Sequence, residues 1–347
     1  MSYEIGMAAL NLQMTERVAR TEYTDSWEIV RHYSGLDPRK DNAAWRGYQD
    51  AVHLDYLWTV NDGPVPWSTR GRVTDLGHAV YNEDGSDFHA SQPSPFTDFE
   101  QVLSFNAVDE YGMLDFEELT SYYEESYQNN RINNPNQVVS GGYYKTLVSG
   151  AIEIFGFEMM LEAMGEDSDR FGEEVLEGIF QQTLHHIKAW ANTSIDVFMC
   201  HDDMVWTEGP FISPNFYRKY IFPRYKELWQ PLKDAGKRVL YTSDGTYDMF
   251  FDDIAAAGAD GFCFEPTNDI NKLVRDYGQT HVIMGGADCR TLTWGSKADI
   301  EAELRSLFDL ARPCPGFVFA TGNHLPSNIP LENAIYYFDL IEEFGKR

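Results

Sequence analysis

Short apolar runs alternate with longer amphipathic segments through the second half of the chain. A strand of a parallel sheet is covered by helices on both faces and is apolar throughout, so these runs predict buried strands. Apolar residues recur every three or four positions in the segments between them, as they do in amphipathic helices. The predicted strands are residues 197–201, 238–242, 261–264, 281–286 and 317–321. The predicted helices are residues 168–192, 214–234, 247–257, 269–276, 297–311 and 330–344.

The first half of the chain has weaker strand signals. Residues 54–64 predict the first strand and residues 137–144 the second, with helices at 26–33, 99–104 and 115–129. Regular alternation of strands and helices is typical of an α/β fold with a parallel sheet. We therefore predict one (β/α)8 TIM-type barrel domain over residues 1–347. Residues 1–50 are predicted to be an N-terminal extension that covers the mouth, meaning the end of the barrel where the strands have their carboxyl ends.

Polar residues follow nearly every predicted strand of the second half. They are His201, Asp202, Asp203, Asp244, Glu265, Asn323 and His324. Catalytic residues of (β/α) barrels come from the carboxyl ends of several strands, so this pattern predicts an enzyme. Adjacent strand ends would bring carboxylates together, which raises a pKa or forms an oxygen-rich metal site. The predicted catalytic residues are Asp203, His201, Asp244, Glu265 and His324.

Each of these residues also has a structural explanation. One aspartate of the run 201–203 can cap the following turn, and another can pair with an arginine of the barrel. Asp244 and Gly245 can simply form a turn, and His324 can be a structural histidine. The sequence alone leaves these alternatives open.

The composition restricts the partners. The chain has 55 acidic residues against 27 lysines and arginines, a formal net charge of −28. It has no basic stripe for nucleic acid, and its charge disfavours an anionic membrane surface. No apolar run approaches the length of a membrane span. The four cysteines form no CxxC pair, which is typical of free thiols in a reducing cytoplasm. We therefore expect a cytoplasmic protein that binds neither nucleic acid nor membranes.

Several segments in order carry a family resemblance. They are HDD at 201–203, GPFISPNFYRKYIFPRYKEL at 209–228, AAAGADGFCFEP at 255–266, GGADCRTL at 285–292 and ATGNHLPSNIPLENA at 320–334. Together they resemble the uroporphyrinogen decarboxylase superfamily over most of the chain. The resemblance implies a distorted (β/α) barrel and one of two chemistries. Members are cofactor-independent decarboxylases, or methyltransferases that exchange methyl groups with a corrinoid protein.

Departures from the family pattern favour one branch. The arginine-rich signature that holds the porphyrinogen carboxylates is absent, and TERVARTEY at 15–23 stands near its place. Thiol-activating methyltransferases of the family bind zinc through His-x-Cys and a later Cys. Thr242 and Asp244 stand at the first two of these positions and Asn323 lies near the third, so a zinc–thiolate site is not expected. The resemblance then implies an O-demethylase that moves a methyl group from a small methoxylated aromatic to the Co(I) corrinoid of a separate protein.

Aromatic and polar residues near the predicted strand ends complete the expected site. The predicted substrate-binding residues are Tyr143, Trp206, Glu208, Tyr241, Thr242 and Asn323, with Phe264 as a further aromatic wall. If a metal such as zinc is bound, the predicted ligands are Asp244, Glu265 and His201. A decarboxylase of another carboxylic acid is the alternative function. Whether the protein forms a homodimer is left open.

Overall fold

The computed structural model describes residues 2–74, 76–77, 80–81, 87–88, 93–322 and 324–347. Seven parallel strands form the main sheet in the order β1-β13-β12-β11-β10-β7-β6. These strands are β1 (Ala19–Arg20), β6 (Gly141–Tyr143), β7 (Val197–His201), β10 (Arg238–Thr242), β11 (Gly261–Phe264), β12 (Val282–Ala287) and β13 (Phe317–Thr321). A separate parallel pair is formed by β2 (Tyr56–Leu57) and β5 (Val138–Val139).

The β2–β5 pair closes the sheet into a barrel. Only Ser140 separates β5 from β6, so the two are halves of one strand. On the other side, the backbone N–H of Asp55 donates to the carbonyl of Arg20 at 2.9 Å, which joins the start of β2 to β1. With β5 and β6 counted as one, the eight strands of a TIM barrel follow one another in chain order. The predicted barrel is confirmed.

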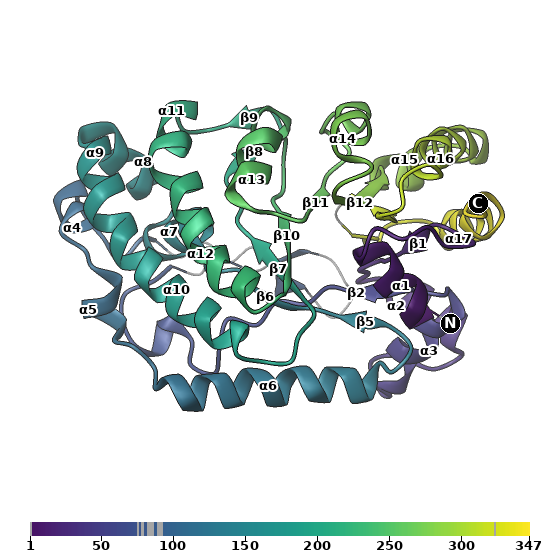
Figure 1. Cartoon of the computed structure of the whole chain (residues 1–347), viewed down its shortest axis with the longest axis horizontal. Coiled ribbons are helices and arrows are strands. Elements are labelled where there is room, and N and C mark those ends of the chain that lie inside the picture. The colour runs from purple at the N-terminus through teal and green to yellow at the C-terminus, as the bar shows by residue number, and fades with distance from the viewer. Residues whose placement is uncertain (1, 75, 78–79, 82–86, 89–92, 323) are drawn as a thin grey trace.

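Helices enclose the barrel, and most of them lie on its outer side (Figure 1). They are α1 (Ser2–Leu10), α2 (Trp27–Ser34), α3 (Ala43–Ala51), α4 (Phe99–Leu103), α5 (Ala107–Tyr111), α6 (Phe116–Asn133), α7 (Leu147–Phe155), α8 (Phe157–Glu166), α9 (Ser168–Arg170), α10 (Leu176–Ala191), α11 (Pro214–Phe216), α12 (Phe222–Asp234), α13 (Phe251–Ala257), α14 (Ile270–Tyr277), α15 (Cys289–Trp294), α16 (Lys297–Ala311) and α17 (Leu331–Phe344). Short elements complete the chain: the 3-10 turns Trp67–Thr69 and Asp248–Phe250, the π-helical turns Phe171–Val175 and Tyr217–Ile221, and the hairpins β3 (Val80–Tyr81) with β4 (Asp87–Phe88) and β8 (Val205–Trp206) with β9 (Gly209–Pro210). None of the helices within the described ranges is both long enough and apolar enough to cross a membrane.

The elements of the second half agree closely with the sequence pattern. The strands at 197–201, 238–242, 261–264 and 317–321 lie where they were predicted, and β12 is shifted by one residue. The predicted helices 168–192 and 214–234 are each interrupted by a π-helical turn. Gly172 of one turn packs against the Tyr220 ring of the other, because a Cβ on Gly172 would lie 2.5 Å from that ring.

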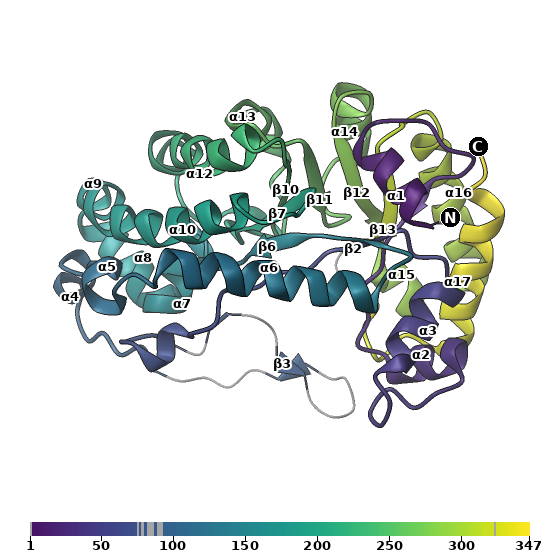
Figure 2. The same ribbon diagram turned by 60° about the horizontal axis from the view of Figure 1, so that its bottom comes forward.

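The first half corrects two predictions. The first barrel strand is β1 at residues 19–20, and the run 54–64 contributes the second strand. Helices α1, α2 and α3 of the predicted extension 1–50 do not cover the mouth, although residues 23–25, which follow β1, line it. Ile5, Ala9 and Leu10 of α1 pack against Val197 and Val282, the first residues of β7 and β12, so α1 closes the opposite end. Helices α2 and α3 pack on each other, and α2 packs on α17 at the outside of the barrel (Figure 2).

Side chains alternate between two apolar clusters along the barrel strands. Met199, Leu240, Met284 and Val318 belong to the cluster inside the barrel, which also contains residues of α1. Their neighbours in the sequence belong to the layer between strands and helices. Successive residues of a strand point to opposite faces, so this alternation decides which polar residues at the strand ends reach the mouth.

Candidate active site

Strand register places the predicted catalytic residues in two layers. Thr242 of β10 pairs with His201 of β7 on one side and with Cys263 of β11 on the other. Asp203, Asp244 and Glu265 come two residues after His201, Thr242 and Cys263, respectively. The sequence pattern alone could not align these strands, since a shift of one residue would reverse the facing of every side chain.

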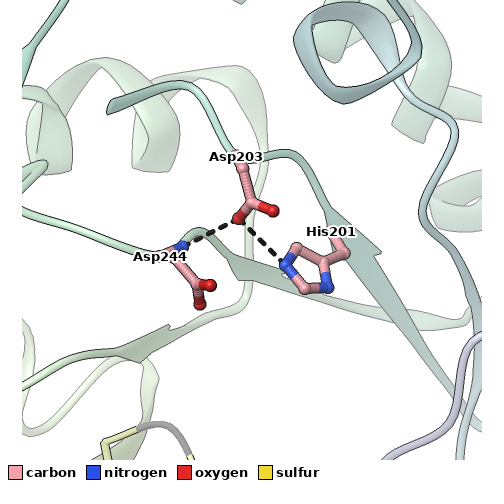
Figure 3. A group of neighbouring side chains, drawn as sticks. All are labelled: His201, Asp203 and Asp244. Carbon is pink, nitrogen blue, oxygen red and sulfur yellow. Dashed lines mark hydrogen bonds and ion pairs between the residues drawn. The ribbon is translucent and has the colours of Figure 1, made fainter. Parts of the chain in front are cut away.

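Asp203 is the centre of the cluster. Its Oδ1 accepts hydrogen bonds from His201 Nε2 at 3.0 Å and from the backbone N–H of Asp244 at 2.9 Å (Figure 3). Its Oδ2 accepts from the hydroxyl of Tyr144 at 2.8 Å. All three contacts stabilise the ionised carboxylate, and two of them come from other strand ends. Asp203 therefore ties β6, β7 and β10 together at the mouth.

The three groups influence one another's protonation. Burial opposes the ionised form of Asp203, but the charge of His201 and the donated hydrogen bonds outweigh it and lower the pKa of Asp203. Burial likewise opposes the charged form of His201, yet Asp203 raises the pKa of His201 to about 8. Desolvation by the surrounding walls of the mouth, followed by the negative charge of Asp203, raises the pKa of Asp244 to about 7, although one side of Asp244 stays open to solvent. At neutral pH the cluster therefore holds an imidazolium–carboxylate pair beside a carboxyl group that gains and loses its proton.

Asp244 is the member of the cluster that solvent reaches. Its residue is exposed, whereas the side chains of His201 and Asp203 are 12% and 22% exposed. Gly245 follows with φ +80°, and a Cβ there would lie 2.6 Å from the carbonyl oxygen of Trp206. Glu265 Oε2 accepts from the Gly245 N–H at 2.7 Å and so fixes this turn. A donor or acceptor on a bound molecule would meet Asp244 first.

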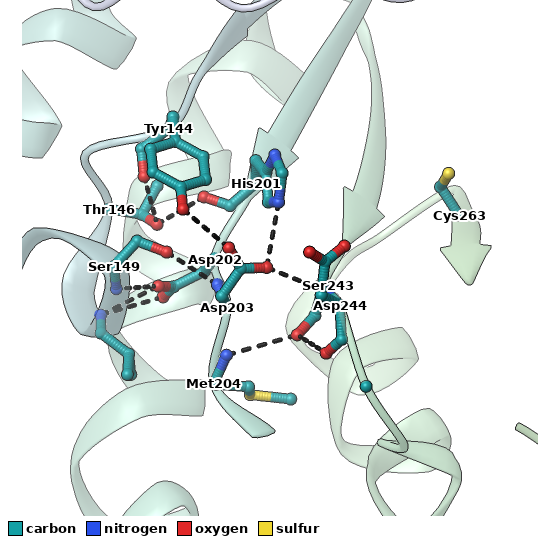
Figure 4. A network of polar contacts seen from close by, with 12 residues as sticks. Tyr144, Thr146, Ser149, His201, Asp202, Asp203, Met204, Ser243, Asp244 and Cys263 are labelled. Atoms are coloured by element: carbon teal, nitrogen blue, oxygen red, sulfur yellow. Dashed lines mark hydrogen bonds and ion pairs between the residues drawn. The ribbon is translucent and has the colours of Figure 1, made fainter. Parts of the chain in front are cut away.

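Asp202 has a structural role. It is fully buried, and its carboxylate accepts from the backbone N–H groups of Val148 and Ser149 at the start of α7 (Figure 4). It also accepts from the hydroxyl of Tyr225 at 2.6 Å. Of the alternatives left open for this run, capping is the one observed, and the capped element is helix α7. The Ser149 hydroxyl in turn accepts from the Asp203 N–H at 2.7 Å, so α7 holds the backbone that carries the cluster.

The cluster has the composition of a metal site as well. One ligand atom each of His201, Asp203 and Asp244 lies within 4.8 Å of the others. One imidazole and two carboxylates suit zinc, manganese or iron. Glu265, predicted as a ligand, is engaged with the Gly245 N–H. Cys263 lies at the level of Thr242, and burial raises the pKa of its thiol to about 12.

His324 lies on the opposite wall of the mouth. It follows β13, whereas His201 ends β7, and four strand positions separate these two around the barrel. His324 Nε2 lies 3.3 Å from Asp25 Oδ2. The Tyr23 ring is 6.1 Å from the His324 ring and 6.4 Å from the Trp58 ring, and Trp58 is 6.0 Å from His201. Aromatic contacts thus connect the two walls.

Sequence reasoning missed this aromatic wall. Trp58 lies in the run 54–64 and Tyr23 in TERVARTEY, and neither segment predicts a substrate-binding aromatic residue by its pattern. Tyr144 ends the predicted strand 137–144, and the centroid of its ring lies 4.5 Å from that of the His201 ring. All three residues closely follow barrel strands, and this position could have indicated a role at the mouth. The sequence pattern does not predict β1, however, so Tyr23 carried no such indication.

Three aromatic residues that were predicted to contact the substrate do not face the mouth. Tyr143, Tyr241 and Phe264 are buried in the layer between strands and helices. Tyr143 stacks on His186 of α10, and the hydroxyl of Tyr241 donates to the carbonyl of Asp202. Strand alternation turns these side chains away from the mouth, so the prediction that they contact substrate is wrong.

The other predicted substrate-binding residues have varied positions. Thr242 is buried inside the barrel beneath the cluster. Trp206 and Glu208 are exposed on the β8–β9 hairpin that follows β7. Asn323 lies outside the described residues.

Comparisons with known proteins agree with this fold. The family model for uroporphyrinogen decarboxylase (URO-D) matches residues 139–344. Curated uroporphyrinogen decarboxylases are similar to this chain at low identity. That of Carboxydothermus hydrogenoformans is 25% identical over 172 residues, covering 50% of this chain and 47% of the relative. One from Thermus thermophilus is 26% identical over 178 residues, covering 50% of each.

The matched region thus spans about half the length of these curated relatives. Among solved structures, a methyltransferase from Methanosarcina mazei is similar over 99% of this chain and 98% of its own, with a TM-score of 0.68 and 17% identity. At that identity the likeness concerns the fold. Because the family model covers more than half of the chain, including the strand ends that carry the cluster, the chain belongs to the uroporphyrinogen decarboxylase (URO-D) family.

Proposed function

We propose that this protein is a methyltransferase that takes a methyl group from a small methoxylated aromatic compound and passes it to the Co(I) corrinoid of a partner protein. The observation that carries the proposal is the cluster of His201, Asp203 and Asp244. It offers a proton at neutral pH at the solvent-accessible end of a barrel lined by aromatic rings. The fold shared with a methyltransferase from Methanosarcina mazei supports the same branch.

Cleavage of an aryl methyl ether needs such a proton. The O–CH3 bond breaks with its electron pair left on oxygen, and a phenolate is a poor leaving group unless that oxygen is protonated. The corrinoid supplies the nucleophile that accepts the methyl group. Asp244, exposed and with a pKa near 7, is placed to donate the proton to the ether oxygen. Asp203 keeps His201 charged beside it, and solvent restores the proton to Asp244.

A partner protein would find apolar side chains around the mouth. Trp206, Met249 and Trp294 are 52%, 45% and 75% exposed. They lie in segments that follow β7, β10 and β12 respectively. Exposed large apolar side chains gathered on one face are typical of interaction sites. Their position supports docking of the corrinoid protein over the mouth.

Decarboxylation of another acid is the competing function, since the curated relatives are decarboxylases. An acidic substrate needs cations that can pair with it. Lys145 and Arg290 follow barrel strands β6 and β12, but Lys145 pairs with Glu153 at 2.5 Å and Arg290 with Asp288 at 2.7 Å. Four carboxylates, Asp25, Asp203, Asp244 and Glu265, belong to segments at the same mouth. This charge balance favours methyl transfer over decarboxylation.

A metal ion is compatible with the same residues. His201, Asp203 and Asp244 would hold it, and a bound metal would act as a Lewis acid at the ether oxygen. Metal analysis of the purified protein distinguishes the two arrangements. One ion per chain would make these residues ligands, and its absence from active protein would leave them as acid–base groups.

The proposed reaction can be tested directly. The protein is incubated with a methoxyarene carrying an isotopic label in its methyl group and with a corrinoid protein in the Co(I) state, and label on the partner is measured. We expect transfer with wild-type protein, a loss of about 100-fold or more in kcat/KM for Asp244→Asn, and little change for the surface control Asp234→Asn. Activity should also fall above pH 7 as Asp244 loses its proton. Loss of methoxyl without label on the corrinoid would contradict the proposal.

A further inference from the structure

A second polar cluster lies across the mouth from the cluster of His201, Asp203 and Asp244 (the His201 cluster), and the proton transfer proposed above does not use it. It consists of Tyr23, Asp25 and His324. The Asp25 carboxylate lies 3.3 Å from His324 Nε2. Burial, followed by the negative charge of Asp25, raises the pKa of Tyr23, so the carboxylate also lies near the Tyr23 hydroxyl. Asp25 is buried, whereas Tyr23 is 46% exposed, so the carboxylate lies beneath two side chains that reach the mouth.

The backbone holds this cluster in place. Leu325 N–H donates to the Tyr23 carbonyl at 2.9 Å, and Asp25 N–H donates to the Leu325 carbonyl at 3.3 Å. The Thr24 hydroxyl donates to the same carbonyl at 2.9 Å. The segment after β1 is thus bonded to the segment after β13. Polar groups fixed in this way are preorganised for a ligand and lose little side-chain entropy on binding.

An aromatic wall links the two clusters. The Trp58 ring lies 6.0 Å from His201 and 6.4 Å from Tyr23, both within the range of direct ring contacts. A flat aryl ring placed against Trp58 would therefore have the His201 cluster on one side and Tyr23 with His324 on the other. One substituent would meet Asp244 and another would meet the second cluster.

Charge decides the kind of substituent that fits the second cluster. A carboxylate on the ring would face Asp25 and the other carboxylates of the mouth, and both lysine and arginine candidates there are already paired. A neutral hydroxyl avoids that repulsion. It can donate to the Tyr23 oxygen or to a neutral His324, and it can accept from a charged one.

From this arrangement we infer that Tyr23, Asp25 and His324 form a binding site for a neutral hydroxyl group, and that the methyl donor is a methoxyphenol. The inference rests on the proposed function, because it names the class of substrate for the same site. Tyr23 and His324 contact the ring hydroxyl, and Asp25 is a positioning residue. Methoxybenzoates and ethers without a second polar group are poorer ligands.

Binding to the protein alone tests this site without turnover. Calorimetric titrations use the three methoxyphenol isomers, anisole and 4-methoxybenzoate. We expect at least one methoxyphenol to bind wild-type protein more tightly than anisole or the benzoate. Tyr23→Phe, which keeps the ring, and His324→Ala should weaken methoxyphenol binding about fivefold to tenfold, the value of one hydrogen bond. Anisole binding should change less than about twofold, and the surface variant His32→Ala should alter neither.

The outcomes separate this inference from the proposed reaction. The inference is overturned if no methoxyphenol binds, if 4-methoxybenzoate binds as tightly, or if both variants weaken anisole and methoxyphenol equally. Binding that depends on Tyr23 and His324 without methyl transfer would support the inference and contradict the reaction. Equal demethylation of anisole and the methoxyphenols would support the reaction and overturn the inference.

Discussion

Two adjacent aspartates should respond in opposite ways to the same substitution. Asp202 accepts from the N–H groups of Val148 and Ser149 and from the hydroxyl of Tyr225, all in a fully buried position. Asp203 lies at the mouth, where its side chain is 22% exposed. Stability should therefore depend on Asp202 and catalysis on Asp203.

The expected loss in free energy of unfolding follows from the number of buried hydrogen-bond donors that lose their acceptor. A buried donor left without a partner costs about 1–3 kcal/mol. Asp202→Ala leaves three such donors, so the free energy of unfolding should fall by at least about 3 kcal/mol. Asp202→Asn keeps one acceptor oxygen and should cost about 2 kcal/mol. Asp203→Asn should cost about 1–2 kcal/mol, because the amide keeps one acceptor oxygen and the side chain is partly exposed.

Denaturant titrations followed by circular dichroism measure these differences, with methyl transfer assayed on the same preparations. We expect Asp203→Asn to lose less unfolding free energy than Asp202→Ala and to lose most of its activity, because the pKa of His201 is no longer raised by the Asp203 charge. The reasoning is refuted if Asp203→Asn unfolds as readily as Asp202→Ala. It is equally refuted if Asp202→Ala keeps wild-type stability.

Two further predictions concern the β1 segment and the aromatic wall. Burial raises the pKa of Glu22 to about 7 from 4.5, so its contribution to stability is present below pH 4.5 and is lost as the pH rises through 7. Between pH 4.5 and 7, wild-type protein should lose about 3 kcal/mol more unfolding free energy than Glu22→Gln. Parallel pH profiles of stability for wild type and Glu22→Gln would contradict this. Trp58→Leu should raise KM for a methoxyarene about threefold to tenfold with kcat less affected, as measured by initial rates, since a stacking contact is worth about 0.5–1.5 kcal/mol. An unchanged KM would mean that the ring does not bind against Trp58.

The sequence determined the barrel and the strands of its second half. Continuous apolar runs predict buried parallel strands whatever the rest of the chain does, and β7, β10, β11 and β13 lie where the runs are. The polar residues after them also had to lie at the carboxyl ends of strands. His201, Asp203, Asp244 and Glu265 could therefore be named as a group before any distance was known.

Strand β1 could not be predicted in the same way. It contributes only Ala19 and Arg20 to the sheet, which is too short a run to give a periodic signal. Since β1 was missed, so was the cluster of Tyr23 and Asp25 that follows it. A two-residue strand is defined by its neighbours β13 and β2, and these are distant in the sequence.

Only the tertiary structure decided the role of each residue at a strand end. Asp202 and Asp203 are chemically identical, but β7 turns one toward α7 and the other toward the mouth. The same alternation buries Tyr143 and Tyr241 while Tyr144 reaches His201. The direction in which a side chain faces depends on the register between strands that are far apart in the sequence, as for His201 and Thr242, and local sequence carries no record of it. The sequence thus named the polar strand ends, and packing selected which of them meet.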